Sequence, residues 1–98
     1  MPSRNITNAA TEILSRNRLR VSWIVQNEDG AIDIFLKQER PGANTVSTTD
    51  HDHLLGAGAS LALNAKTDGK EAIQDRWTII AASGTPLISF FETEDVVR

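Results

Sequence analysis

The chain has 98 residues, a formal net charge of −3 and no cysteine. This length fits one domain with a single core, and without cysteine there are neither disulfides nor thiolate chemistry. A chain with net negative charge does not neutralise phosphates broadly, so we expect no nucleic-acid partner. No apolar run approaches the length of a membrane span, and the first residues lack the apolar stretch of a secretory signal. We therefore expect no membrane association and synthesis in a cytoplasm.

The N-terminal residues are the least patterned part of the chain. Residues 1–8 predict an extended arm that becomes ordered on assembly, which leaves residues 9–98 as the single domain. Residues 9–17 fit two structures. Ala10, Ile13 and Leu14 suit a short amphipathic helix with Asn8 as its cap, and they also suit an edge strand through "ATEIL". We favour the strand, because the rest of the chain reads as β-structure.

The segment "RVSWIVQNEDGAIDIFLKQ", residues 20–38, predicts a β-hairpin. Val21, Trp23 and Val25 alternate with polar residues, which is the period of a strand with one buried face. Asp29-Gly30 is a strong hairpin signal, since both residue types tolerate positive φ. Apolar residues again take alternate positions after this turn: Ile32, Ile34 and Leu36.

The middle of the chain predicts short strands between polar loops. Residues 39–45 form a loop around Pro41-Gly42, and residues 45–49, "TVSTT", form a short β-prone piece. "GAGASLALN" reads as a turn into a strand that places Leu61 and Leu63 on one side. Residues 65–72, "AKTDGKEA", predict a polar loop or tight turn.

The last part of the chain predicts a second hairpin. Trp77, Ile79 and Ala81 share one face of a strand over residues 75–83. "SGTP" then turns the chain into "LISFFETE", residues 87–94, and the tail "DVVR" would be a strand end or a contact arm. Six to eight short strands with regular turns, and no βαβ alternation, predict an all-β sandwich or small barrel.

Both histidines of the chain lie in "DHDH", residues 50–53. On a strand, His51 and His53 share one face, and this H-x-H spacing can hold Zn²⁺ or Ni²⁺. The other ligands would have to be carboxylates, because there is no further histidine or cysteine. The default interpretation is a solvated polar loop, and the alternative is a metal site with His51 and His53 as the candidate ligands. A pH-sensitive contact with a partner is the intermediate alternative, because histidine titrates near neutral pH.

Other chemical motifs are weak. "GASLA" differs from the G-x-S-x-G nucleophile elbow at its last position, and Ser60 leads into a strand where the elbow needs a helix. "GAG" at residues 56–58 lacks the lysine and the helix of a phosphate-binding loop. Arg16, Arg18 and Arg20 alternate in "SRNRLR" and would share one face of an extended segment. We interpret that face as a partner contact or a solvated edge.

The order of these segments resembles small virion structural proteins of tailed bacteriophages. The resemblance rests on "ATEIL", then "NRLRVSWIVQNEDGAIDIFL", then "LGAGASLAL", and finally "RWTIIAASGTPLISFFETE", which together cover about residues 9–94. Each motif is weak alone, since each is also common in β-hairpins, so the order and spacing carry the resemblance. The "DHDH" segment has no counterpart in the pattern and would mark a variable loop that faces a partner.

The resemblance implies a β-sandwich or jelly-roll-like module that binds the major capsid protein or other virion proteins in many copies. It brings no catalytic residues, so we expect a virion protein that is not an enzyme and has no cofactor. Capsid decoration or cement is the first expectation, with a homo-oligomer, taken as a trimer. A tail, neck or fibre component is the first alternative. A metal- or carbohydrate-binding β module that uses residues 50–53 is the second. The expected partner contacts are Arg16, Arg18, Arg20, His51 and His53.

Overall fold

The computed structural model describes residues 3–39, 44–64 and 68–94, and within them it is almost entirely β-structure. The expected tail element at residues 95–98 lies outside this range, as do residues 40–43 and 65–67 of two expected loops. The elements are β1 (Ser3–Asn5), β2 (Thr11–Leu14), β3 (Arg20–Asn27), β4 (Ile34–Glu39), β5 (His53–Leu55), β6 (Ser60–Asn64), α2 (Lys70–Gln74), β7 (Arg76–Ala81) and β8 (Leu87–Glu94).

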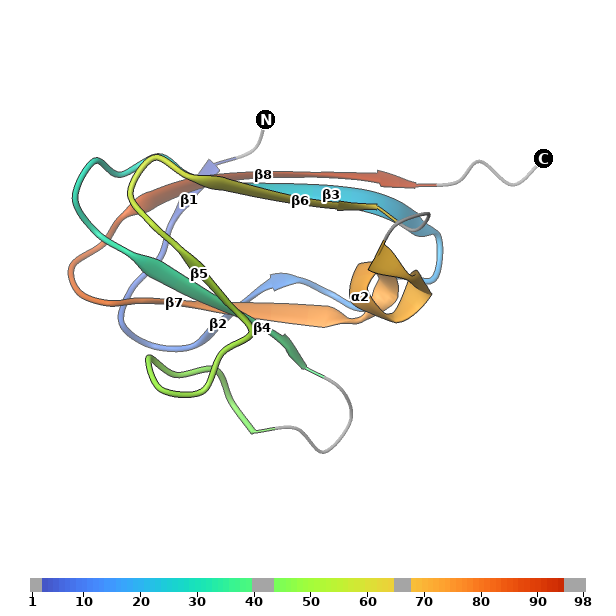
Figure 1. Ribbon diagram of the computed structural model, residues 1–98, viewed down its shortest axis with the longest axis horizontal. Helices are drawn as coiled ribbons and strands as arrows, with labels where there is room; N and C mark the ends of the chain where they lie inside the picture. Colours follow the sequence, from blue (N-terminus) through green and yellow to red (C-terminus); the bar gives the residue numbers. More distant parts are fainter. Residues whose placement is uncertain (1–2, 40–43, 65–67, 95–98) are drawn as a thin grey trace.

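These strands form two antiparallel four-stranded sheets with jelly-roll connectivity. Sheet A has the order β1-β8-β3-β6 and sheet B the order β2-β7-β4-β5. The pairs β1–β8, β2–β7, β3–β6 and β4–β5 describe one long ribbon that folds back between β4 and β5. The ribbon rolls up where β3 meets β8 and β4 meets β7, which is the arrangement of a jelly roll. Figure 1 shows the two sheets as layers, and the predicted all-β, jelly-roll-like sandwich is confirmed.

Both predicted hairpins are wrong, although their strands are present. β3 lies in sheet A and β4 in sheet B, and β7 and β8 are divided in the same way. The connections over residues 28–33 and 82–86 therefore cross from one sheet to the other. The first connection is hydrogen-bonded to the second connection and to β8. Ala82 N–H donates to Asp33 O at 3.0 Å, and Glu28 N–H donates to Leu87 O of β8 at 3.0 Å. These tertiary hydrogen bonds replace those of a tight hairpin turn.

The N-terminal segment belongs to the sandwich. β2 confirms the strand favoured for residues 9–17 over the helix. β1 pairs with β8, the N–H of Ile6 donates to Pro86 O at 3.0 Å, and the Ile6 side chain is 1% exposed. Residues 3–8 are thus ordered within the isolated chain, which corrects the expected arm over the described part of residues 1–8.

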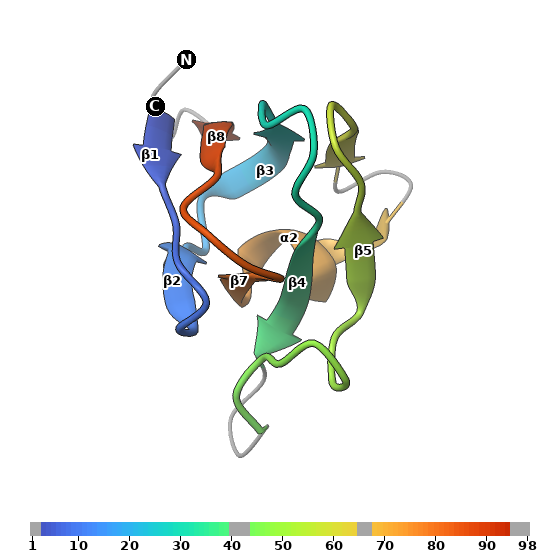
Figure 2. The same ribbon diagram turned by 90° about the vertical axis from the view of Figure 1, so that its left-hand side faces the viewer.

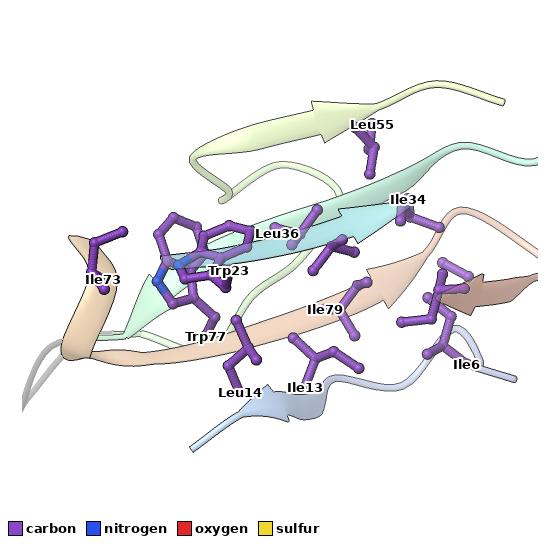
Figure 3. Close-up of a cluster of buried hydrophobic side chains, with 13 residues drawn as sticks. Ile6, Ile13, Leu14, Trp23, Ile34, Leu36, Leu55, Ile73, Trp77 and Ile79 are labelled. Carbon is purple, nitrogen blue, oxygen red and sulfur yellow. The ribbon is translucent and has the colours of Figure 1, made fainter. Parts of the chain in front are cut away.

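The core lies between the two sheets and is shown in Figure 3. Trp77, Ile79 and Ala81 are buried together, as the alternation in β7 predicts. Trp23 from sheet A and Trp77 from sheet B meet at one end of the core, with ring centroids 4.9 Å apart. Leu61 and Leu63 face the same core from β6, as expected.

Helix α2 closes the tryptophan end of the sandwich, where the sequence predicts a polar loop (Figures 1 and 2). Its Ile73 side chain is fully buried in the core. The indole N–H groups of Trp23 and Trp77 both donate to the carbonyl oxygen of Ala72, at 3.2 and 2.8 Å. A five-residue helix shows too little periodicity to stand out in the sequence. It is held here by groups from both sheets, which satisfy the carbonyls at its C-terminal end.

A β-bulge at the start of β3 reverses the expected orientation of two side chains. The pairing of β3 with β8 shifts between Arg20 and Ser22. Because an extra residue inverts the alternation, Arg20 points inward and is 1% exposed, while Val21 is 38% exposed. The alternation predicts the opposite for both residues.

Candidate interaction face

The outer face of sheet A is formed by side chains from four strands. Side chains alternate across a strand, and the buried residues Trp23, Val25 and Ile88 show which alternate set faces the core. Residues paired across the strands lie on the same face, so the registers identify the outer set. It consists of Ser3, Asn5, Ser22, Ile24, Gln26, Ser60, Ala62, Asn64, Leu87, Ser89, Phe91 and Thr93. None of these outward residues in the described strands is charged.

The charged side chains of the same strands all occupy the other, inward set of positions. They are Arg4, Arg20, Glu92 and Glu94. Arg20 Nε lies 2.5 Å from Glu92 Oε2, and Arg4 donates to Glu12 O of β2 at 3.2 Å. Glu94 accepts a hydrogen bond from Asn17 at 3.1 Å. Charge is therefore directed to the ends and edges of the sandwich, which leaves the sheet A surface neutral.

The centre of this face is apolar. In the register, Phe91 of β8 lies beside Ile24 of β3, and Ile24 lies beside Ala62 of β6. Phe91 is 47% exposed. A hollow of about 230 Å³ opens next to it, over β3 and β6, and its lining includes Phe91, Ile24 and Ala62. The face thus carries an exposed aromatic ring beside a depression, inside a border of serine, threonine, asparagine and glutamine.

The outer face of sheet B has a different character. Arg76 bridges its two neighbouring strands, with Nε 2.6 Å from Glu12 Oε2 and Nη1 3.7 Å from Glu39 Oε1. Lys37 Nζ lies 2.9 Å from Asp50 Oδ2. Charged pairs of this kind keep a sheet surface solvated and resist burial against another protein. The two faces of one sandwich therefore differ in what can be packed against them.

The loop over residues 44–52 covers part of sheet B and contains no strand, so the β-prone segment predicted at residues 45–49 is wrong. Val46 is buried, and the side chain of Phe35, which points outward from β4, is only 8% exposed. The ring of His51 packs on Phe35 with centroids 4.6 Å apart. Asp52 N–H donates to Leu36 O at 2.8 Å. The loop is attached to β4 by both apolar and polar contacts.

The two histidines of "DHDH" do not point toward a common metal site. His51 packs on Phe35, whereas His53 stacks on Trp77 at 5.7 Å with an interplanar angle of 29°. Asp50 pairs with Lys37, and Asp52 accepts the N–H of Gln38 at 2.8 Å. Over the described part of the chain, no group of three or more histidine, cysteine or acidic side chains is arranged to hold a metal ion. The segment serves to attach the loop and β5 to sheet B.

A second hollow of about 480 Å³ lies beside His53, with Gln38, Asp52 and Trp77 in its lining. Its volume is in the range of small-ligand sites. The indole of Trp77 is 1% exposed, because Trp23 and His53 pack against it. An aromatic platform on which a sugar ring could stack is thus covered, and the polar rim atoms of Gln38 and Asp52 already hydrogen-bond to Asp75 and to the β4 backbone.

The arginines of the expected contact face are separated by the structure. Arg16 and Arg18 are exposed in the connection between β2 and β3, and Arg16 lies 4.0 Å from Asp75. Arg20 is buried, so it is a structural residue and the expected partner contact there is wrong. Ser60 begins β6, directly after the turn at Gly58, whose φ is 74°. A nucleophile elbow needs a helix at that point.

Sequence reasoning missed the uncharged face entirely. Its residues come from four strands that are distant in the chain, and each strand alone shows only ordinary alternation. The absence of charge on one side of "SWIVQ", "SLALN" and "LISFFET" was visible, but only the strand order places these segments side by side.

Comparisons of the chain with protein-family models, with curated proteins and with solved structures gave no match. Among the described residues, no helix is long and apolar enough to cross a membrane.

Proposed function

We propose that this protein is a non-enzymatic structural component of a tailed-bacteriophage virion, and that it decorates the capsid and stabilises the head by bridging capsid subunits. The observation that carries the proposal is the uncharged outer face of sheet A, with Phe91 exposed at its centre. A patch without charged residues and with an exposed aromatic side chain has the composition of a protein–protein interface core. The face acts by being buried in the assembled particle.

The fold supports this role by analogy. Jelly rolls occur in viral capsid proteins, and also in lectins and cupins, so the fold alone does not select a function. The order of the sequence segments and the uncharged face of sheet A together support the virion role. The protein acts as a homo-oligomer in contact with the major capsid protein, and its exposed Arg16 and Arg18 are available to a partner with acidic groups.

A tail, neck or fibre component is the alternative within the same class. Quantifying the protein in purified particles separates the two roles: we expect hundreds of copies for a shell protein, against about three to twelve for a component on the tail axis. A low copy number would move the assignment to the tail or neck.

The decoration role predicts a gain in particle stability. Empty heads that carry the protein should resist heat and dilution better than heads without it. Phe91→Lys should lose this effect, because the lysine places an unpaired charge in the buried face. Leu54→Lys is the matched control, since Leu54 is 55% exposed on sheet B and its substitution should leave stabilisation unchanged. Equal stability of heads with and without the protein would contradict the proposal.

A further inference from the structure

We infer that the partner of the uncharged face is a second copy of this chain, and that two copies pack sheet A against sheet A as a two-fold dimer. This inference rests on the proposed role of that face as a protein contact and names its partner. It draws on three observations: the neutrality of the face, the position of Phe91 beside a hollow, and the central place of both in the sheet.

Neutrality makes the face compatible with itself. In a two-fold contact, each patch meets an identical patch, so a charge on this face would be buried in the contact without an opposite charge on the facing patch. The outward residues of β1, β8, β3 and β6 avoid this cost, whereas the sheet B face presents Arg76 and its acidic neighbours. The hydroxyl and amide side chains around the rim can each donate and accept hydrogen bonds, so identical groups are able to pair.

The relief of the face is self-complementary. Phe91 projects from β8, and the hollow of about 230 Å³ lies over β3 and β6. A cavity of about 150 Å³ is enough to hold a benzene molecule, so the hollow can accept a phenyl ring. A reciprocal contact would place Phe91 of each copy against Ile24 and Ala62 of the other.

The sheet order places the two-fold axis at the centre of the face. In the order β1-β8-β3-β6, the midline runs between β8 and β3. An axis along this line, parallel to the sheets, stacks β8 on β3 of the second copy and β1 on β6 of the second copy. Since Phe91 and Ile24 are paired in the register, the same axis brings Phe91 directly over Ile24 of the second copy. All four strands take part, in the aligned packing typical of stacked sheets.

The size of the face predicts a reversible dimer. With strands about 4.8 Å apart and outward side chains about 6.7 Å apart along each strand, the face covers roughly 400 Å² per copy. The two copies together would bury roughly 800 Å², which is less than the roughly 1,000 Å² of a stable specific interface, so the complex is weak or transient. A weak pair can still contribute to a shell, because many copies act there at high local concentration.

Sedimentation velocity of the purified chain, from micromolar to millimolar concentration, tests the dimer. We expect the mass to rise from 10.7 kDa toward twice that value. Phe91→Lys should weaken the dimer at least tenfold, which is about 1.4 kcal/mol. Leu54→Lys should leave it unchanged, and circular dichroism should show that both variants fold.

Ala62→Phe distinguishes the insertion of Phe91 into the hollow from nonspecific association of apolar surfaces. It adds apolar surface but fills the hollow, so we expect a weaker dimer. A stronger dimer would overturn the fit of Phe91 into the hollow.

A chain that is monomeric at every concentration, or that forms trimers, would overturn the two-fold pairing. If a monomeric chain still needs Phe91 to stabilise heads, the dimer fails and the decoration role stands. If heads gain no stability at all, the decoration role fails.

Discussion

Two buried polar side chains at opposite ends of β3 connect the sheets of this molecule. At one end, Arg20 donates to Ile73 O at 2.9 Å, to Asp75 O at 3.3 Å and to Ser15 O, and it pairs with Glu92. Its charge also lies at the C-terminal end of α2, where the helix dipole is negative. At the other end, Asn27 donates from Nδ2 to Ile32 O at 2.8 Å, in the connection to β4, and to Leu55 O at 3.1 Å, at the end of β5 in sheet B. Such groups specify one arrangement of strands, since any other leaves them without partners.

Replacement of Arg20 tests this role. Arg20→Met keeps much of the length of the side chain but leaves Glu92 and the carbonyls at the end of α2 without their donor. We expect the free energy of unfolding to fall by about 1–3 kcal/mol, because the carbonyl oxygens lose a charged donor, whereas Glu92 is 37% exposed and stays solvated. Urea denaturation followed by tryptophan fluorescence measures the change. Arg18→Met is the control, because Arg18 is exposed, and equal midpoints for the two variants would show that Arg20 has no structural role.

At the scale of elements, the two crossings between the sheets form one unit. The connections over residues 28–33 and 82–86 are hydrogen-bonded to each other and lie at the same end of the sandwich. Gly84 has φ +62°, and a Cβ on it would lie 3.0 Å from Ile32 Cδ1 in the other connection. Gly30, which the sequence places in a hairpin turn, does not have positive φ, and a Cβ on it would meet nothing within 4 Å. Gly84 is therefore the glycine that the crossing requires.

A pair of alanine substitutions separates the two glycines. Gly84→Ala should lower the free energy of unfolding by about 1–2 kcal/mol, because a left-handed backbone disfavours a Cβ and Ile32 must move. Gly30→Ala should be neutral or slightly stabilising, since it reduces the freedom of the unfolded chain. Thermal unfolding of both variants is the measurement. Destabilisation by Gly30→Ala alone would indicate the hairpin that the sequence predicts.

For the whole molecule, the start of the chain completes the fold. β1 pairs with β8 at the edge of sheet A, opposite the edge formed by β6. Between β1 and β2 the chain passes from sheet A to sheet B, and Ile6 enters the core there at 1% exposure. The ribbon thus closes only when its two ends, β1 and β8, meet. An N-terminal arm that orders on assembly would leave β8 with one neighbour instead of two.

Truncation of Ile6 distinguishes a closed sandwich from a sandwich with a free arm. Ile6→Ala should cost about 2–4 kcal/mol, as for other large-to-small changes in a core. Leu19→Ala removes a side chain that is 44% exposed and should have little effect. Chemical denaturation of the purified chain compares the two. If the unfolding curve of Ile6→Ala coincided with that of the unsubstituted chain, the N-terminal segment would be a free arm that does not contribute to the core.

The sequence by itself determined most of the strands of this protein and the class of its fold. Alternation in β3, β7 and β6 identified Trp23, Trp77, Leu61 and their neighbours as core residues, because period-two burial is a local property of an extended chain. "ATEIL" was likewise recognised as a strand. The proximity of the histidines also followed from the sequence, although their separate aromatic partners did not.

Only the tertiary structure decided which strands pair, where charge is buried and which face carries no charge. A turn signal such as Asp29-Gly30 marks a change of direction, but it does not say whether the next strand joins the same sheet. A single-residue bulge moved Arg20 from the expected surface to the interior. The uncharged face exists because four separate strands place their neutral sides together, and long-range pairing of this kind is set by the packing of the whole ribbon.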